Sequence, residues 1–261
     1  MNFETLKSKL KKANRIFLFL DFDGTLTPIV KTPYKVYLDN STKKLLKKIS
    51  KNKNFILGII SGRTIKDLKK RVGLDNILYA GNHGLEIYDK KKLSLLKGLS
   101  FKFYQKILKD IEKRIEKKLK NIKGVILENK RVILAIHYRN VAQNKVSYLK
   151  RIVKQILSEY VNKNVHLKLG RGKKVIEIRP DVVFNKFLAL RFFEGLFKKN
   201  KKDITIYAGD DLTDEEVFSK LKKRDIGIRI GRKKKDSSAD YFLKSPTELK
   251  RFLSFLLELK S

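Results

Sequence analysis

One short apolar run that leads directly into two aspartates constrains the fold of this chain more than any other feature. The run is Ile16–Leu20, and Asp21 and Asp23 follow it, with Gly24 and Thr25 next. A continuous apolar stretch of this length predicts a strand buried on both faces, which is typical of parallel sheets covered by helices. Ligands bind beyond the carboxyl ends of such strands. The junction therefore predicts an α/β protein with two carboxylates in its binding site.

Two carboxylates at one strand end point to metal-assisted chemistry. Like charges this close disfavour joint ionisation, and a divalent cation would relieve the repulsion. A metal-bound aspartate can be both a ligand and a nucleophile toward a phosphoryl group. Cleavage of a phosphomonoester also needs a proton donor for the leaving alkoxide. On these grounds Asp21 is the candidate nucleophile, Asp23 the candidate general acid and base, and Thr25 a hydroxyl beside the phosphate.

The chain alternates strands and helices near both ends, whereas its middle follows another pattern. Strand–helix–strand spacing predicts a parallel sheet with right-handed crossovers. The expected strands of this sheet are Ile16–Leu20, Phe55–Ile60, Ile77–Ala80, Asp203–Ala208 and Asp225–Ile230. The expected helices are Ser41–Lys51 with Ser41 as its N-cap, Thr64–Arg71, Asn185–Phe197, Thr213–Leu221 and Pro246–Leu259.

The middle of the chain contains a helix–strand–strand unit that occurs twice. The helices are Phe101–Asn121 and Gln143–Tyr160, each with one apolar face. The strands are Val125–Glu128, Val132–His137, Val165–Leu169 and Val175–Ile178, with Gly170–Gly172 as a connection between the last two. This order predicts a four-stranded antiparallel sheet covered by two helices. We therefore expect a doubly wound, mostly parallel Rossmann-like core from residues 1–97 and 181–261, and an α+β (αββαββ) domain inserted over residues 98–180.

Two further polar motifs belong to the predicted core. Ser61 and Gly62 directly follow a buried strand, so a hydroxyl and a backbone amide could hold a phosphate oxygen. The alternative for Ser61 is a helix N-cap. Lys186, near the start of a helix, could neutralise phosphate and the Asp21 carboxylate, the alternative being an ordinary surface lysine.

A fourth motif concentrates acidic residues in a strongly basic chain. Five of them fall within Asp210–Glu216, directly after an apolar strand. Acidic residues favour helix N-termini because of the macrodipole, and this alternative suits Asp214 and the two glutamates after it. It does not explain the carboxylates at the strand end, where Asp210 is a suitable oxygen ligand for Mg²⁺.

The four motifs, in this order, resemble those of the haloacid dehalogenase-like phosphatases, whose first motif is DxDGT. The sequences GDDLTDE at 209–215 and AGNHG at 80–84 narrow the resemblance to the trehalose-6-phosphate phosphatase family. The insert is similar as well, at Glu128–Lys130, His137–Arg139, Gly172–Lys173 and Glu177–Pro180. The resemblance extends from about Phe17 to the end of the chain.

This resemblance implies a Mg²⁺-dependent phosphatase that hydrolyses trehalose 6-phosphate to trehalose and phosphate through an aspartyl-phosphate, with the insert as a cap over the sugar. The implied catalytic residues are Asp21, Asp23 and Lys186. The implied metal site consists of Asp21, Asp23 and Asp210, with Asp211 and Asp214 nearby. The implied phosphate-binding residues are Thr25, Ser61, Gly62 and Lys186. The implied substrate-binding residues are Arg63, His83, Glu128, Lys130, Arg139 and Glu177. The chain departs from the family in having Phe187, where a glycine usually follows the motif lysine.

The composition limits which bonds, metal sites and binding partners this protein can have. The chain has 261 residues, no cysteine and a net charge of +36, so disulfides and thiolate metal sites are excluded. Its apolar runs are too short to span a bilayer. The lysines are spread along the sequence in pairs and triplets such as Lys233–Lys235, which favours a solvated basic surface over a dedicated nucleic-acid segment. We expect a cytoplasmic monomer with a small sugar phosphate as substrate, and nonspecific binding of nucleic acid at low salt.

Two alternatives remain open. The first is a related phosphatase for another sugar phosphate, such as that of sucrose or mannosylglycerate. The second is a nucleic-acid-binding protein on a retired phosphatase fold, which the high net charge would suit. The complete set of Asp21, Asp23, Lys186 and Asp210 argues against the second alternative.

Overall fold

The structure is a computed structural model that describes residues 4–30, 36–96, 99–162, 165–172, 174–232 and 236–260. Lys173 of the insert motif and the lysine triplet at 233–235 lie outside the described residues. The chain divides into two compact units, one formed by residues 1–97 and 184–261 and the other by residues 98–183. The junction expected at residues 97 and 98 also lies outside the described part of the chain.

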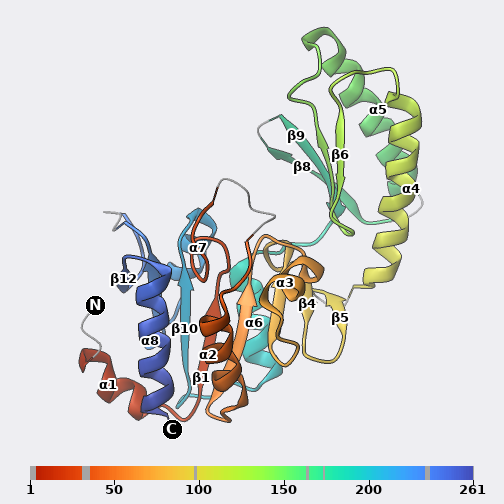
Figure 1. The fold of residues 1–261 in the computed structure, drawn as a ribbon. Coiled ribbons are helices and arrows are strands. Elements are labelled where there is room, and N and C mark those ends of the chain that lie inside the picture. The colour runs from red at the N-terminus through yellow and green to blue at the C-terminus, as the bar shows by residue number, and fades with distance from the viewer. Residues whose placement is uncertain are drawn as a thin grey trace. The chain divides into compact units, whose positions relative to one another are not determined.

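The first unit is built on one eight-stranded sheet with the order β12-β11-β10-β1-β2-β3-β4-β5 (Figure 1). The strands are β1 (Ile16–Leu20), β2 (Phe55–Ile60), β3 (Leu78–Gly81), β4 (Glu86–Tyr88), β5 (Leu93–Leu95), β10 (Ile204–Gly209), β11 (Ile226–Ile230) and β12 (Tyr241–Leu243). Neighbours from β12 to β3 pair in parallel, and β4 and β5 are antiparallel. The predicted doubly wound, mostly parallel α/β core is therefore confirmed.

Helices cover both faces of this sheet. They are α1 (Glu4–Lys11), α2 (Asn40–Lys51), α3 (Ile65–Val72), α6 (Lys186–Leu196), α7 (Leu212–Phe218) and α8 (Pro246–Leu259). Alternate side chains of β1 serve two separate hydrophobic clusters, because successive residues of a strand point to opposite faces. Ile16, Leu18 and Leu20 join the cluster that contains α1, α2, α3 and α8. Phe17 and Phe19 join the cluster that contains α6 and α7.

Local capping fixes where several of these helices begin. Thr64 and Asn185 cap α3 and α6 with their side chains. The expected N-cap of α2, Ser41, is wrong, because Asp39 occupies that position and accepts hydrogen bonds from the backbone of residues 41 and 42. A carboxylate two residues earlier satisfies the free amides of the first turn, so the serine becomes part of the helix.

The second unit contains a four-stranded antiparallel sheet with the order β6-β7-β9-β8 and two helices. The elements are α4 (Phe101–Leu119), β6 (Ile126–Asn129), β7 (Leu134–His137), α5 (Gln143–Val161), β8 (Leu167–Gly172) and β9 (Val175–Pro180). Their order along the chain is the expected αββαββ. One expected connection is wrong, because Gly170–Gly172 continues β8 and pairs with β9 as far as Val175.

Four short elements have no counterpart among the expected ones. These are α1, β4, β5 and β12. The three strands have only three residues each and extend the sheet at its two ends. Segments this short carry too little periodicity to be recognised without their sheet neighbours. Among the described residues, no helix is both long and apolar enough to cross a membrane.

Candidate active site

Two carboxylates meet where two neighbouring strands in the parallel part of the core sheet end. β1 and β10 are parallel neighbours, with Leu20 opposite Ala208. Asp21 and Asp210 follow these strands and therefore emerge at the same edge of the sheet. Gly24 has a positive φ of 82°, and a Cβ there would lie 2.2 Å from Asp210 Oδ2. Only glycine lets the loop after β1 come this close to the Asp210 carboxylate.

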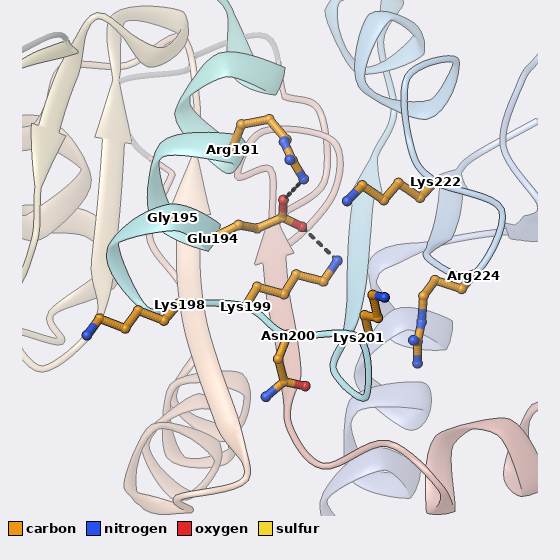
Figure 2. A pocket seen from close by; sticks show the side chains of 9 residues that line it. All are labelled: Arg191, Glu194, Gly195, Lys198, Lys199, Asn200, Lys201, Lys222 and Arg224. Carbon is orange, nitrogen blue, oxygen red and sulfur yellow. Dashed lines mark hydrogen bonds and ion pairs between the residues drawn. The ribbon is translucent and has the colours of Figure 1, made fainter.

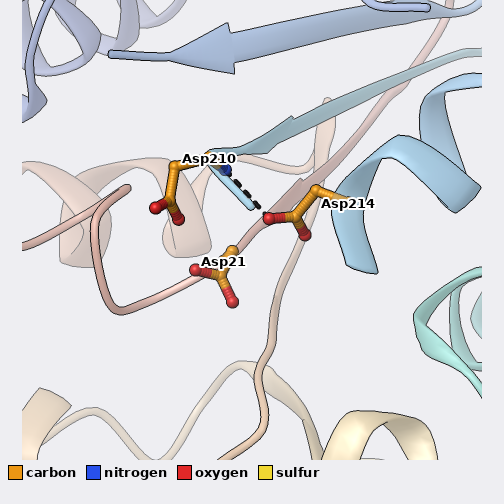
Figure 3. A group of neighbouring side chains, drawn as sticks. All are labelled: Asp21, Asp210 and Asp214. Atoms are coloured by element: carbon orange, nitrogen blue, oxygen red, sulfur yellow. Dashed lines mark hydrogen bonds between the residues drawn. The ribbon is translucent and has the colours of Figure 1, made fainter. Parts of the chain in front are cut away.

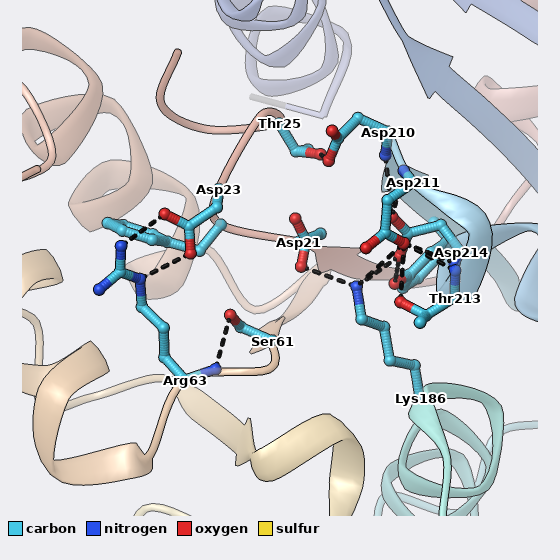
Figure 4. A network of polar contacts seen from close by, with 12 residues as sticks. Asp21, Asp23, Thr25, Ser61, Arg63, Lys186, Asp210, Asp211, Thr213 and Asp214 are labelled. Carbon is cyan, nitrogen blue, oxygen red and sulfur yellow. Dashed lines mark hydrogen bonds and ion pairs between the residues drawn. The ribbon is translucent and has the colours of Figure 1, made fainter. Parts of the chain in front are cut away.

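Lys186 joins this carboxylate group from the start of α6 (Figure 4). Its ammonium is 2.9 Å from Asp21 Oδ1 and 2.8 Å from Asp214 Oδ1, and the residue is only 3% exposed. The alternative of a surface lysine is therefore wrong. Burial lowers the pKa of Lys186, but Asp21 and Asp214 more than compensate and raise it above its ordinary value. The family usually has glycine at the position of Phe187. The Phe187 side chain packs against the hydrophobic cluster that contains α6, and Lys186 keeps its place in the site.

Asp214 is a buried bridge rather than an exposed helix-terminal acid. One of its oxygens accepts hydrogen bonds from Lys186 Nζ and, at 2.5 Å, from the Tyr207 hydroxyl. The other accepts from the backbone N–H groups of Asp210 and Asp211. Asp211 is the N-cap of α7 and forms a capping box with Asp214. A favourable interaction with the helix macrodipole therefore explains the position of Asp214 only in part. This fully buried carboxylate also orients Lys186 and the loop after β10.

The donor set at this edge fits a divalent cation. Asp21, Asp210 and Asp214 each offer an oxygen within 4.8 Å of the others (Figure 3). Asp214 uses both oxygens in the hydrogen bonds above, whereas Oδ2 of Asp21 and Oδ2 of Asp210 accept none from a described residue. Asp21 and Asp210 therefore suit direct coordination, and Asp214 suits a supporting position behind them.

The carboxylates also show the charge conflict that a cation would relieve. Burial raises the pKa of Asp21 well above its ordinary value, and Lys186 opposes this only in part. Burial, together with Asp214 and Asp211, raises the pKa of Asp210 to about 6. Both shifts favour neutral carboxyl groups, whereas a bound cation favours the ionised ones.

Asp23 is turned toward Arg63 (Figure 4). Both its oxygens are 2.6 Å from guanidinium nitrogens, Oδ2 from Nε and Oδ1 from Nη2. Arg63 is held in turn by Asp67 at 2.8 Å and lies over the ring of Phe22. Asp23 and Arg63, expected in separate roles, therefore form one ion pair beside Asp21.

The remaining expected phosphate-binding residues line the same part of the core. Thr25 is buried, and its hydroxyl donates to Asp210 Oδ1 at 3.2 Å. Ser61 is buried and accepts from the backbone of Arg63, while Thr64 serves as the helix cap, so the N-cap alternative for Ser61 is wrong. A Cβ on Gly62 would lie 2.7 Å from the ring of His83, so these two residues are in close contact.

Four of the predicted substrate-binding residues belong to the second unit, and three of them lie on one face of its sheet. Glu128 is opposite Ala135, and Ala135 is opposite Glu177, so the two glutamates share a face. Lys130 and His137 contact Glu128 Oε2 at 3.7 and 3.2 Å. The neighbours of Glu177 in β9 are buried isoleucines, so the opposite face is the one that is covered.

Arg139 differs from these three candidates. It lies beyond the end of β7, is exposed, and makes no hydrogen bond or ion pair with the described residues. The structure does not bring it together with Glu128, Lys130 or Glu177.

Two residues of the core network were missed by sequence reasoning. Tyr207 donates to Asp214, and a tyrosine inside a buried strand needs such a partner for its hydroxyl, which is a usable signal. Asp67 of α3 accepts hydrogen bonds from Arg63, just before the helix, and from Arg71 within it, and the four-residue spacing to each arginine is a usable signal.

Comparison with proteins of known structure gives the class of this fold. A haloacid dehalogenase-like hydrolase from Bacteroides thetaiotaomicron aligns over 93% of this chain and 99% of that chain, with a TM-score of 0.58 and 15% identity. A trehalose-6-phosphate phosphatase from Aspergillus fumigatus aligns over 99% of this chain and 98% of its own, with a TM-score of 0.71 and 26% identity. The chain thus has the haloacid dehalogenase-like hydrolase fold.

Sequence comparison narrows this class further. Trehalose-phosphate phosphatase B of Arabidopsis thaliana is 35% identical over 95% of this chain and 68% of its own length. A probable trehalose-phosphate phosphatase 4 of Oryza sativa is also 35% identical, over 99% of this chain and 70% of its own. The family model for trehalose-phosphatase matches residues 19–247. The chain belongs to the trehalose-phosphatase family.

Proposed function

We propose that this protein is a Mg²⁺-dependent phosphatase that hydrolyses trehalose 6-phosphate to trehalose and phosphate through an aspartyl-phosphate. The family of the chain supports the substrate. The observation that carries the chemistry is the buried cluster in which Lys186 contacts Asp21 while Asp210 lies beside it. It combines a nucleophile, a cation and free ligand oxygens at the edge of the sheet where ligands bind.

The proposed first step uses Asp21 and Asp23. A carboxylate oxygen of Asp21 attacks phosphorus, the bond from phosphorus to the sugar oxygen breaks, and Asp23 donates a proton to that oxygen. A metal ion held by Asp21, Asp210 and the Asp23 carbonyl would neutralise charge on the phosphoryl group. Lys186 fixes the position of Asp21 and offsets negative charge beside it, and Ser61, Gly62 and Thr25 surround the phosphate.

The second step returns the enzyme to its starting state. Asp23 takes a proton from water, the water oxygen attacks phosphorus, and the bond to Asp21 breaks to release phosphate. Both steps require the Asp23 carboxylate close to the reacting oxygen. Since its two oxygens are on Arg63 in this structure, we propose that substrate binding separates that pair. Arg63 would then be free to contact the substrate, and His83 would lie beside it.

We propose that residues 98–180 form a cap that recognises the sugar part of the substrate. Glu128, Lys130 and Glu177 present two carboxylates and an ammonium on one face of their sheet. Carboxylates accept hydrogen bonds from sugar hydroxyls, and an ammonium donates to their oxygens. A monosaccharide phosphate would not supply the sugar hydroxyls that these groups are proposed to bind, which would select against it. We propose that Arg139, two residues beyond His137, lies close to this sugar site.

The decisive test is phosphate release from trehalose 6-phosphate, glucose 6-phosphate and sucrose 6-phosphate, each with Mg²⁺ and with EDTA. We expect fast, metal-dependent release from trehalose 6-phosphate alone. The matched control is Asp21→Asn, which should lose at least about a thousandfold in rate while still folding cooperatively. Release from the other sugar phosphates instead would keep the mechanism and discard the specificity.

A second set of proposals concerns partners. We propose a monomer that acts on a small substrate in the cytoplasm and binds no specific nucleic acid. Light scattering after size-exclusion chromatography and localisation of the tagged protein test the first two points. A salt-resistant, sequence-selective complex with DNA or RNA would contradict the third.

A further inference from the structure

A cavity lies in the core unit at the amino ends of the sheet strands, whereas the candidate active site lies at their carboxyl ends. It has a volume of about 570 Å³ and is lined by the end of α6, the loop that leads into β10 and the segment before β11. Asp210 follows the carboxyl end of β10, whereas Lys201 precedes its other end. Six residues of strand separate the two sites by roughly 20 Å. The cavity therefore does not belong to the catalytic edge.

The floor of this cavity is an ionic network whose charges cancel. Glu194 is 3% exposed and pairs with Arg191 and with Lys199, the latter at 2.8 Å (Figure 2). Lys199 also reaches Asp225 at 2.7 Å, and the Thr205 hydroxyl donates to Glu194 at 2.5 Å. Two buried carboxylates thus meet two cations, so the acidic residues of the floor are already neutralised.

The remaining cations of the lining have no such partners. Lys198, Lys201, Lys222 and Arg224 are exposed, and their side chains make no hydrogen bond or ion pair with any described residue. Figure 2 shows Lys222, Lys201 and Arg224 on one side of the cavity and Lys198 on the other.

General lysine content does not account for this lining. Six of the nine lining residues are basic, against 63 of 261 in the whole chain. Unpaired like charges around one cavity raise the local positive potential and cost stability unless an anion neutralises them.

We propose that this cavity binds a compact anion with several phosphate groups, such as tripolyphosphate or the triphosphate of a nucleotide. Several cations without side-chain partners around one cavity suit a ligand that carries several negative charges, whereas a single phosphate would leave most of them unpaired. Arg224 can hold a phosphate with two parallel hydrogen bonds, and the lysines act as point charges beside it. The volume lies within the range of small-ligand sites.

The test is calorimetric titration with sodium tripolyphosphate, in metal-free buffer at about 150 mM salt so that distant surface charges are screened. We expect saturable binding of one tripolyphosphate in the cavity. The double variant Lys222→Gln/Arg224→Gln should weaken it at least about tenfold, because it removes two of the charge contacts. The matched control Lys117→Gln/Lys118→Gln removes the same charge from exposed positions of α4 and should stay within about twofold.

Several outcomes would overturn the proposal. Equal weakening in both double variants would assign the binding to general surface charge, and the absence of saturable binding would remove the site. Binding of long single-stranded RNA without binding of tripolyphosphate would assign the basic residues to a macromolecule. The charge-retaining variant Lys222→Arg/Arg224→Lys checks folding, and it should bind tripolyphosphate almost as tightly as the original protein. All these variants should hydrolyse the sugar phosphate at the original rate, which separates this proposal from the catalytic one.

Discussion

Lys186 is the residue on which the organisation of the candidate active site most depends. Its ammonium contacts Asp21 and Asp214 and lies 3.9 Å from Asp211, in surroundings that exclude water. Removing one member of a buried ion pair costs more than the pair contributes, because the partner charge remains buried and uncompensated.

We predict that Lys186→Met lowers the free energy of unfolding by about 3–5 kcal/mol at neutral pH and abolishes turnover. Urea unfolding and phosphate release measure the two effects. Lys199→Met is the matched control, since the Lys199 side chain is only 9% exposed and also lies between two carboxylates, but away from the catalytic edge. It should destabilise the protein while folded molecules keep their rate. Unchanged stability of Lys186→Met would contradict the observed network.

Asp23 offers a second prediction at the residue scale, which depends on the leaving group. As a general acid it matters most for a poor leaving group such as a sugar alkoxide. We predict that Asp23→Asn slows the first turnover of trehalose 6-phosphate by about 10²–10⁴-fold, and that of p-nitrophenyl phosphate much less.

Rapid quench of single turnovers measures both rates. Asp75→Asn, at a carboxylate that is 92% exposed, controls for loss of charge and should change neither rate. An equal loss with both substrates would assign Asp23 a role in binding or folding instead.

At the scale of elements, capping determines where helices begin and how firmly they hold neighbouring loops. Asp39 accepts hydrogen bonds from the first turn of α2, and these outweigh its partial burial and lower its pKa to about 2. A lowered folded-state pKa means that the carboxylate stabilises the fold above its unfolded pKa. That stability is lost as pH falls from about 4 toward 2.

We predict that Asp39→Ala costs about 1 kcal/mol at pH 7 and that the difference from the original protein shrinks as the pH approaches 2. Chemical unfolding at a series of pH values measures it. Asp39→Asn keeps a capping oxygen without the charge, so it should lose less stability than Asp39→Ala and show less pH dependence. A constant difference for Asp39→Ala across this pH range would contradict the assigned pKa shift.

At the scale of the whole molecule, the net charge of +36 dominates the electrostatic free energy of the folded protein. Self-repulsion of so many positive charges destabilises the compact state, and dissolved salt screens it. We predict that the unfolding midpoint rises when sodium chloride increases from about 10 mM to about 150 mM, where the Debye length falls from about 30 to about 8 Å.

Scanning calorimetry measures this effect, and sucrose at matched osmolarity controls for changes in water activity. The same screening should raise KM for the anionic substrate, since steering by the basic surface weakens. A midpoint that falls with salt would mean that attractive ion pairs outweigh the repulsion.

The sequence alone determined the fold class and most elements of the core. Buried strands such as Ile16–Leu20 are nearly continuous apolar runs, and α8 has the predicted bounds, because its proline and capping serine are local signals. The short strands β4, β5 and β12 were missed, since their sheet neighbours rather than their own sequences define them.

Only the tertiary structure decided which charges belong together. Sequence order separates Asp21 from Lys186 by 165 positions, and parallel pairing of β1 with β10, together with the start of α6, brings them to 2.9 Å. The same packing buries Asp214, which local sequence describes as an exposed helix acid, and pairs Asp23 with Arg63. Local sequence determines what each segment can form, whereas burial and long-range pairing determine the partner and therefore the role of each charged group.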